Sequence, residues 1–460
     1  MNSLELKRLK SAVAGEAAAI RIVTRLEPVG HPRDKVFPPT YAGGEYATEK
    51  RYSVEATKGD GAQTDENAPV DAVLLHSVAG EANLMEEALK AAIREGRLGV
   101  GEQRLEIPLL QVSFAGTVAA DYIPEPITVL DAPHRVFDAI FRDSEVAAKN
   151  GNGTTVFKDT PAGQAIAKAS SANATPLYEW SPTSLIFGCW NSANDKVPGK
   201  IKGNLKIPRT IVSEIVGFHT VVGKKVGGKI DPLGITRQPI YEDGNGNWTP
   251  LQSAAKKDDG GNPMKFRVKN KAKGIPSEIL HGNIAPSIGG TGDEGSPNGG
   301  VTMKYAQQTT VLSLSALRRL RFPVNGQQNT QRDLAARTVL AALGLVAITA
   351  QRERDYFLRS RCELRAVDTP PFEFVVQGRP LCEHDQFSLT FEEAVKLLEQ
   401  AIAEAKDLMD KDGNPIGVAW KSASDLPSLS PKANLAELIR LSHEQGGAED
   451  EEQDQSAGIE

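Results

Sequence analysis

The stretch that decides the fold is Val70–Leu75 (VDAVLL) followed by Ala82–Arg94 (ANLMEEALKAAIR). The first piece is short and apolar, which is typical of a β-strand. The second piece repeats its apolar residues at helical spacing, so it predicts an amphipathic helix. A strand followed by a helix is the first half of a split βαβ unit. We therefore expect an α+β domain.

The chain around this unit continues the alternation of strands and helices. Further strands are predicted over 20–27, 105–114, 301–312 and 372–376, and residues 185–190 and 210–216 are each either a buried strand or a short helical piece. Further helices are predicted over 4–19, 133–148, 160–170, 313–320, 333–358 and 391–408. Interleaved strands and helices with long insertions indicate an α+β core of the ferredoxin or RNA-recognition-motif type.

The domain organisation follows from length and composition. The chain has 460 residues, and we expect one elaborated domain over residues 1–443. Residues 217–300 are rich in Gly, Lys and Asn and too long for an ordinary loop, so they predict a functional insertion. Residues 444–460 carry seven acids and no Lys or Arg, the composition of a disordered tail. Without these seven charges, the formal net charge of −6 becomes +1.

Positive charge in this nearly neutral body is gathered into three stretches. Residues 200–229 hold seven cations and one acid, residues 265–273 alternate a cation with another residue, and three arginines crowd into residues 318–321. Cations that repel each other are usually kept together where an anion neutralises them, and nucleic acid is the commonest such anion. The predicted RNA-binding residues are Lys206, Arg209, Thr210, Ser213, Lys224, Lys225, Lys229, Lys265, Arg267, Lys269, Lys271, Lys273, Arg318, Arg319 and Arg321. Thr210 and Ser213 are included as hydrogen-bonding partners of the RNA backbone.

Two of these stretches have a plain alternative. Residues 265–273 are equally compatible with a solvated hairpin whose outer face is charged. The arginines at 318–321 are expected at the start of a helix, where the dipole favours anions. The alternative is that one of them pairs with a core acid and the others are solvated. Tyr178, Trp180, Phe187 and Trp190 are more typical of a core than of a base-stacking surface, although aromatic residues near cations suit single-stranded RNA.

The sequence contains no recognisable catalytic or cofactor-binding motif. Residues 290–295 match the dinucleotide fingerprint by letter but follow no predicted strand. Cys382 and His384 have no second Cys or His pair at zinc spacing. Three scattered cysteines suit a reducing cytosol, and the longest apolar run, Val339–Ala350, is too short to span a bilayer. We expect a cytoplasmic, non-enzymatic protein with no membrane, metal or cofactor.

Four blocks of sequence together resemble a known family. They are Val73–Asn83 (VLLHSVAGEAN), Ser181–Trp190 (SPTSLIFGCW), Arg209–Gly217 (RTIVSEIVG) and Val311–Phe322 (VLSLSALRRLRF). In this order they resemble the CRISPR-associated RAMP family of type I-U (now I-G) systems, the Cas-seven-like backbone subunit of Cascade, over about residues 20–380. The chain departs from the family pattern at His76, Gly80 and Leu84, where Asp, Ser and Arg are frequent. These departures weaken the expectation that the helix after Asn83 contacts RNA directly.

The resemblance implies an RNA-recognition-motif-like palm with inserted finger and thumb elements. It further implies that several copies assemble along one CRISPR RNA and present it for pairing with target DNA in antiviral defence. The implied partners are CRISPR RNA, target DNA through the guide, other copies of the chain, and the other Cascade subunits (Cas-five/Cas-six-type and large).

Two alternatives belong to other functional classes. One is a type III-like backbone subunit in which an insertion aspartate assists metal-dependent cleavage of target RNA; the candidates are Asp231, Asp243, Asp258 and Asp259. The other is an unrelated RNA-binding enzyme.

Overall fold

The computed structural model describes residues 3–53, 68–100, 103–147, 153–191, 205–235, 238–266, 274–288, 298–378, 380 and 382–444. The chain divides into two compact units. Unit 1 comprises residues 1–34, 47–219 and 303–460, and unit 2 comprises residues 35–46 and 220–302.

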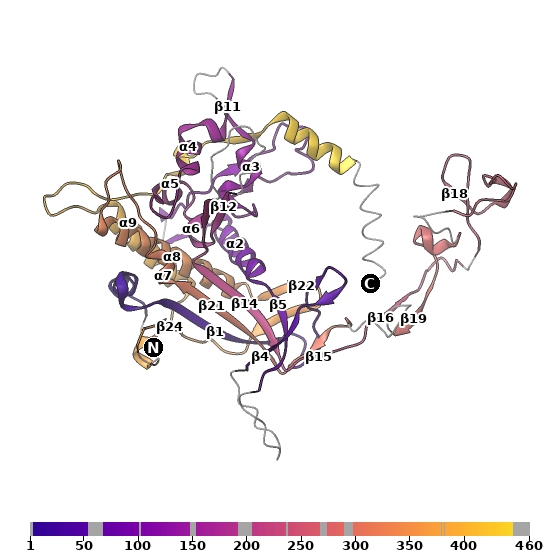
Figure 1. Cartoon of the computed structure of the whole chain (residues 1–460), viewed down its shortest axis with the longest axis horizontal. Helices are drawn as coiled ribbons and strands as arrows, with labels where there is room; N and C mark the ends of the chain where they lie inside the picture. Colours follow the sequence, from indigo (N-terminus) through magenta and orange to yellow (C-terminus); the bar gives the residue numbers. More distant parts are fainter. Residues whose placement is uncertain are drawn as a thin grey trace, which may run out of the picture. The chain divides into compact units, whose positions relative to one another are not determined.

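A nine-stranded sheet forms the centre of unit 1 (Figure 1). The strand order is β22-β23-β1-β21-β14-β5-β4, and β24 joins β1 to β25. All of its strand pairs are antiparallel. The strands are β1 (Ala19–Pro28), β4 (Thr48–Arg51), β5 (Val70–His76), β14 (Ile211–Phe218), β21 (Tyr305–Ser313), β22 (Tyr356–Arg359), β23 (Cys362–Ala366), β24 (Phe372–Val375) and β25 (Gln386–Phe387).

The two faces of this sheet differ because side chains alternate along each strand. On β1, Ile20, Ile22 and Leu26 are buried, whereas Val23 and Arg25 between them are exposed. The same alternation runs along β21, where Gln308, Thr310 and Leu312 are buried. One face of the sheet therefore packs against the helices.

Three long helices supply that packing. They are α2 (Val78–Arg94), α8 (Thr330–Glu353) and α9 (Phe391–Lys406). Helix α2 packs against β14 and α8, and α9 packs against α8. Residues from α1 (Leu6–Ser11) and the π-helix that follows it (Ala12–Glu16) join the same core.

Helix α8 is the centre of the hydrophobic core. Asn329 caps its first turn by accepting hydrogen bonds from the amides of Gln331 and Arg332 at 2.9 and 3.0 Å. The helix is long and apolar enough to cross a membrane by length and composition, but 94% of its most apolar window is buried inside the protein. It is therefore the core helix that the run Val339–Ala350 predicts.

A smaller five-stranded sheet and several short elements complete unit 1. The sheet has the order β11-β10-β26-β8-β9, and β12 and β13 pair separately, as do β6 and β7. These strands are β6 (Gly99–Val100), β7 (Gln103–Arg104), β8 (Gln111–Val112), β9 (Ile127–Thr128), β10 (Ser144–Ala147), β11 (Thr154–Val156), β12 (Cys189–Asn191), β13 (Leu205–Ile207) and β26 (Leu429–Pro431). The short helices are α3 (Ala139–Arg142), α4 (Pro161–Ala167), α5 (Thr175–Trp180), α6 (Thr183–Ile186) and α7 (Leu314–Leu317). Residues 433–444 are also helical.

Unit 2 consists of two-stranded pairs joined by turns. Its pairs are β2 (Thr40–Tyr41) with β3 (Glu45–Tyr46), β15 (Val221–Val222) with β20 (Val301–Thr302), β16 (Val226–Lys229) with β19 (Ile284–Ile288), and β17 (Tyr241–Glu242) with β18 (Trp248–Thr249). The predicted insertion, residues 217–300, and the 220–302 segment of unit 2 differ by at most three residues at each end. No pattern in the sequence indicates that residues 35–46 belong to the same unit.

Sequence periodicity predicted the long elements and failed on some short ones. The α+β class is confirmed, and the strand and helix of the opening stretch form as β5 and α2. The strand predicted over 105–114 is wrong except at Gln111 and Val112. The helix predicted over 133–148 forms only as a 3₁₀ turn at Arg135–Phe137 and as α3 at Ala139–Arg142, after which the chain continues into β10. Both stretches are apolar because they pack on the core, and that burial does not require a regular element.

Candidate nucleic-acid interface

A groove of about 630 Å³ runs along one side of α2, and we call it the α2 groove. Its floor and walls come from α2, from residues 130–135 and from the chain that precedes β14. Its cations are Lys90, Arg94, Arg135, Arg209 and Arg354, and its acids are Glu86, Glu87 and Asp131. All of these residues lie in unit 1.

The floor of the groove contains a buried ion pair. Arg135 donates through Nε and Nη2 to the two carboxylate oxygens of Glu86 at 2.7 and 2.8 Å. Its third nitrogen donates to the carbonyl of Gly188 at 2.9 Å. Burial raises the pKa of Glu86 to about 7, against the opposing effect of the Arg135 charge. The charge of Glu86 therefore changes near neutral pH.

The cations along the rim are paired with acids from other segments. Lys90 donates to Asp131 at 2.7 Å, and Arg94 donates to Glu125 at 2.7 Å. Arg354 pairs with Glu95 at 3.3 Å. Such partly exposed ion pairs contribute little to stability, so each cation can readily exchange its carboxylate partner for another anion.

Arg209 is in a different position. It donates a hydrogen bond from Nη1 to the carbonyl of Val78 at 3.2 Å, and within the described part of the chain it forms no ion pair. Burial lowers the pKa of Arg209, and the charge of Arg135 lowers it further. An anion that enters the groove would compensate this charge, which makes Arg209 the strongest candidate for a phosphate contact.

A glycine allows the chain to place Arg209 there. Gly188 has a φ of +80°, and a Cβ at this position would lie 2.7 Å from the backbone nitrogen of Arg209. Only glycine combines that conformation with so close an approach. Gly188 thus brings the chain before β14 against the end of α6 and orients Arg209 toward α2.

Trp190 and Lys206 extend this area as a cross-strand pair. Trp190 on β12 is opposite Lys206 on β13 in the antiparallel register. Trp190 is 45% exposed. Its ring packs edge-on against the His134 ring, with 5.9 Å between the two ring centres. An exposed indole beside a cation can stack a base while the cation contacts a phosphate. Of the aromatic residues named from the sequence, Tyr178 and Phe187 are buried in the core, as expected.

Thr210 and Ser213 require a correction. Both are 2% exposed. Thr210 donates its hydroxyl to the carbonyl of Ile186 at 3.1 Å, and Ser213 donates to Glu81 at 2.8 Å. Their hydroxyls are therefore engaged within the core, and the expectation that they bind an RNA backbone does not fit their positions.

The three arginines after α7 have three different environments. Ser313 caps α7, but the helix ends at Leu317, so the arginines follow its C-terminal end and the dipole argument is wrong. Arg318 donates to the carbonyls of Ala12, Val13 and Ala17. Arg321 pairs with the buried Asp333 at 3.4 Å, and Arg319 is exposed. Arg319 is thus the member most available to an outside anion.

The predicted lysines of unit 2 lie on its surface. Lys224, Lys229 and Lys265 are exposed and Lys225 is half-buried, while Lys229 also donates to the carbonyl of Leu280. Arg267, Lys269, Lys271 and Lys273 lie outside the described residues. The alternation of residues 265–273 therefore stays a prediction.

Three of the four aspartates of the cleavage alternative accept backbone hydrogen bonds, and the fourth, Asp259, is exposed. Asp231 is buried and accepts hydrogen bonds from the amides of Leu233 and Gly282. Asp243 and Asp258 each accept two amides of their own turn. Across the described ranges, no group of three or more His, Cys, Asp or Glu side chains is arranged to hold a metal ion.

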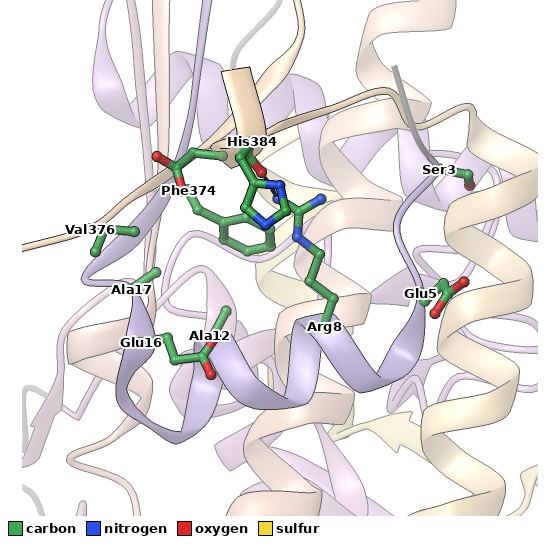
Figure 2. Close-up of a pocket in the computed structure, with 10 residues that line it drawn as sticks. Ser3, Glu5, Arg8, Ala12, Glu16, Ala17, Phe374, Val376 and His384 are labelled. Atoms are coloured by element: carbon green, nitrogen blue, oxygen red, sulfur yellow. Dashed lines mark hydrogen bonds between the residues drawn. The ribbon is translucent and has the colours of Figure 1, made fainter. Parts of the chain in front are cut away.

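A second cavity, of about 950 Å³, opens between α1 and β24 (Figure 2). The Arg8 guanidinium lies 5.0 Å from the centre of the Phe374 ring and donates to the carbonyl of His384. Figure 2 shows the His384 ring beside this guanidinium, and Glu16 on the helical segment that also carries Arg8. Because Glu5 and Glu16 line the cavity while Arg8 is already engaged, it is a poorer place for a nucleic-acid backbone than the α2 groove.

Sequence reasoning missed most of the α2 groove. Lys90 and Arg94 are four residues apart and so share a helix face, which is the one signal that was present. Arg135 and Arg354 are far in sequence from α2 and from Arg209, and only the fold brings them to the groove. The departures noted at His76, Gly80 and Leu84 lie outside the residues that line it.

Comparison with known proteins adds a family to this geometry. Residues 20–221 match the family model described as CRISPR-associated protein GSU0053. A search of the curated proteins found no match. The matched stretch contains α2, Trp190 and Arg209, and therefore most of the α2 groove. Over residues 20–221, this chain is similar to the CRISPR-associated protein GSU0053 family.

Proposed function

We propose that this chain is a CRISPR-RNA-binding backbone subunit of the RAMP type in a type I-G (I-U) Cascade complex. Several copies oligomerise along the guide RNA and present it for pairing with target DNA in antiviral defence. The subunit is a cytoplasmic, non-enzymatic scaffold. It works with the other Cascade subunits (Cas-five/Cas-six-type and large), and it needs no cofactor or metal.

The strand order of the main sheet supports an RNA-recognition-motif-like palm. Four neighbouring strands stand in the order β24-β1-β21-β14. In chain order, α2 falls between β1 and β14, and α8 falls between β21 and β24. This order matches the β-α-β-β-α-β arrangement of the ferredoxin-like split βαβ fold, with β5 as an additional strand, and so supports the proposed palm. Unit 2 is inserted between β14 and β21, at the position of an inserted finger or thumb.

The observation that carries the proposal is the environment of Arg209. Among the described residues it is a partly buried cation without an ion pair. The exposed Trp190, which pairs across the strands with Lys206, follows by two residues the Gly188 that contacts Arg209. A cation for the phosphate and an aromatic ring for the base are the two elements of single-stranded nucleic-acid binding. Neither element selects a sequence, which suits a protein that holds every guide alike.

The cleavage alternative has less support. Asp231 is committed to two backbone amides, and the turns of Asp243 and Asp258 use those carboxylates in the same way. Incubation of the assembled complex with complementary RNA and magnesium separates the two functions, because regularly spaced cuts would favour the alternative.

The test is co-expression with a CRISPR array, followed by size exclusion with absorbance read at 260 and 280 nm. The unchanged chain should elute at high mass with RNA of one discrete length. Arg209→Ala should lose most of that RNA for every spacer, because a charge-assisted phosphate contact contributes roughly 1.5–3 kcal/mol. Lys396→Ala on the exposed side of α9 removes the same charge outside the groove and should retain the RNA. Equal RNA content in the two variants would contradict the assignment of the groove.

A further inference from the structure

We propose that Glu87 makes the α2 groove selective for RNA over DNA, because its carboxylate accepts a hydrogen bond from a ribose 2′-hydroxyl. The inference rests on the proposed function, since it names the part of the nucleotide that this groove recognises. Glu87 is a specificity-determining residue in this arrangement, whereas Arg209 supplies affinity for phosphate.

Glu87 differs from the other acids of the groove in having no ion-pair partner among the described residues. Glu86 is held by Arg135. Asp131 pairs with Lys90 at 2.7 Å. Glu87 is exposed on α2, lines the groove, and forms no side-chain hydrogen bond or ion pair within the described part of the chain. An unpaired carboxylate repels phosphate, so its place in the groove is explained only if the ligand also brings a hydrogen-bond donor.

The position of Glu87 keeps its charge away from the phosphate that Arg209 binds. Arg209 donates to the carbonyl of Val78, and Glu87 follows Val78 by nine residues, which is about 14 Å along the helix axis. Asn83 lies between them, one turn before Glu87, and it is also exposed and lines the groove. A strand that is held at Arg209 and runs along α2 therefore meets Glu87 at a different nucleotide.

The RNA backbone offers a single kind of donor to this carboxylate. Phosphate oxygens and the ribose ring oxygen only accept hydrogen bonds, whereas the 2′-hydroxyl of every nucleotide can donate one. The N–H groups of the bases differ from base to base, so a carboxylate directed at them would favour particular sequences. A subunit that holds every guide alike cannot depend on such a contact. The 2′-hydroxyl is therefore the partner that satisfies Glu87 in every guide.

The same contact disfavours DNA. A hydroxyl that donates to a carboxylate forms a charge-assisted hydrogen bond, which is stronger than one between neutral groups. Deoxyribose lacks the hydroxyl, so a DNA strand in the groove loses this bond and leaves the Glu87 carboxylate beside its backbone without a donor. We expect the groove to bind RNA about tenfold more tightly than DNA of the same sequence.

The experiment compares two full-length variants, Glu87→Ala and Glu392→Ala. Glu392 is the control because it is also an exposed helical glutamate, on α9 and outside the groove. The labelled probes are oligouridine, oligodeoxyuridine and 2′-fluoro oligouridine, which keeps the sugar pucker of RNA but has no 2′ donor. Glu87→Ala should bind oligouridine about tenfold more weakly and the other two probes no more weakly than the unchanged chain does. Glu392→Ala should bind all three normally, and Glu87→Gln, which keeps an uncharged acceptor, should give an intermediate loss.

Other patterns would overturn the inference. Glu87→Ala would weaken all three probes alike if Glu87 had a structural role, and it would strengthen all three if its carboxylate were only a solvated charge. Equal binding of oligouridine and 2′-fluoro oligouridine by the unchanged chain would also exclude the 2′-hydroxyl contact. A loss that occurs with oligouridine but not with oligoadenosine would assign Glu87 to a base instead.

Salt dependence separates this contact from the phosphate contact on which the proposed function rests. Arg209→Ala should reduce the slope of log affinity against log salt by about 0.7, the value for one phosphate of a single strand, whereas Glu87→Ala should not reduce it. If Arg209→Ala changes neither slope nor affinity while the effect of Glu87→Ala persists, the 2′-hydroxyl contact stands and the role of Arg209 fails. If the unchanged chain binds no probe, the proposed function itself fails, whereas binding without a preference for ribose overturns this inference alone.

Discussion

Ser213 on β14 donates its hydroxyl to the carboxylate of Glu81 on α2 at 2.8 Å, and this contact joins the groove-bearing helix to the main sheet. The same carboxylate oxygen accepts from Gln308 at 2.6 Å, and the other oxygen lies 2.7 Å from Nδ1 of His76. Glu81 is completely buried. A buried carboxylate is tolerated when such donors satisfy it, and the satisfied network then fixes the position of α2.

Replacement of Ser213 by Ala should therefore lower stability rather than RNA affinity. Loss of one donor to a buried carboxylate costs about 1–3 kcal/mol in the free energy of unfolding, measured by urea denaturation. Ser430→Ala, on the exposed side of β26, is the control and should change stability by less than about 0.5 kcal/mol. Weaker RNA binding by a fully stable Ser213→Ala variant would instead indicate that Ser213 contacts the RNA backbone directly.

Gly80 and His76 should show strong coupling. A Cβ on Gly80 would lie 2.4 Å from Nε2 of His76, and the ring is held in place by its contact with Glu81. We expect Gly80→Ala to destabilise the protein by about 1–3 kcal/mol, and His76→Ala to remove most of that cost. Thermal or urea unfolding of the four members of the double-mutant cycle measures the coupling. Gly227→Ala, where a Cβ meets nothing within 4 Å, is the control. Additive effects would mean that the ring moves aside freely.

The arginines after α7 should separate into a structural and a binding member. Arg318 satisfies three carbonyls near the end of the N-terminal helical segment, so Arg318→Ala should cost about 1–3 kcal/mol of stability. Arg319→Ala should leave stability unchanged and weaken RNA retention about equally for all spacer sequences, because a phosphate contact carries no sequence information. Filter binding with several spacers checks this, and a sequence-dependent loss would rule out the phosphate role of Arg319.

RNA affinity should fall as pH rises through about 7. Burial raises the pKa of Glu86 to about 7, so this carboxyl gains its charge near that pH, beside Arg135 and Arg209. Because the pKa of Glu86 is higher in the folded than in the unfolded protein, its contribution to folding stability is complete below the pKa of the unfolded state. That contribution is lost as pH rises toward 7. Fluorescence titrations between pH 6 and pH 8 should show weaker binding at the upper end. In Glu86→Gln this pH dependence should flatten, and an unchanged profile would assign it to another group.

Trp190 should act through its ring rather than its size alone. Trp190→Ala is expected to weaken oligouridine binding by about tenfold, since stacking of one base contributes roughly 1–3 kcal/mol. Trp190→Phe should retain most of the affinity. The exposed Phe357 on β22 lies outside the groove, so Phe357→Ala should bind normally. If Trp190→Phe were as weak as Trp190→Ala, the indole would have a role other than stacking.

The regular elements could be predicted because their signals are local. The alternation of Ile20, Ile22 and Leu26 predicts β1, and the apolar face of residues 82–94 predicts α2, since each pattern has the period of its own element. The failures at 105–114 and 133–148 have the opposite cause. Those apolar residues are buried by contact with distant parts of the chain, and burial by itself leaves the backbone conformation open.

The sequence by itself determined the α+β class, the long helices, the long strands and the concentration of cations around residues 206–209 and 318–321. Only the tertiary structure decided which of those cations are available. Arg321 pairs with Asp333, Arg318 satisfies carbonyls near residues 12–17, and Ser213 lies in the core, whereas Arg209 and Arg319 form no ion pair among the described residues. The physical reason is that periodicity is set by near neighbours, whereas burial and ion pairing depend on residues far apart in the chain. Arg135 meets Glu86 across 49 positions of sequence, and the fold brings that pair beneath Arg209.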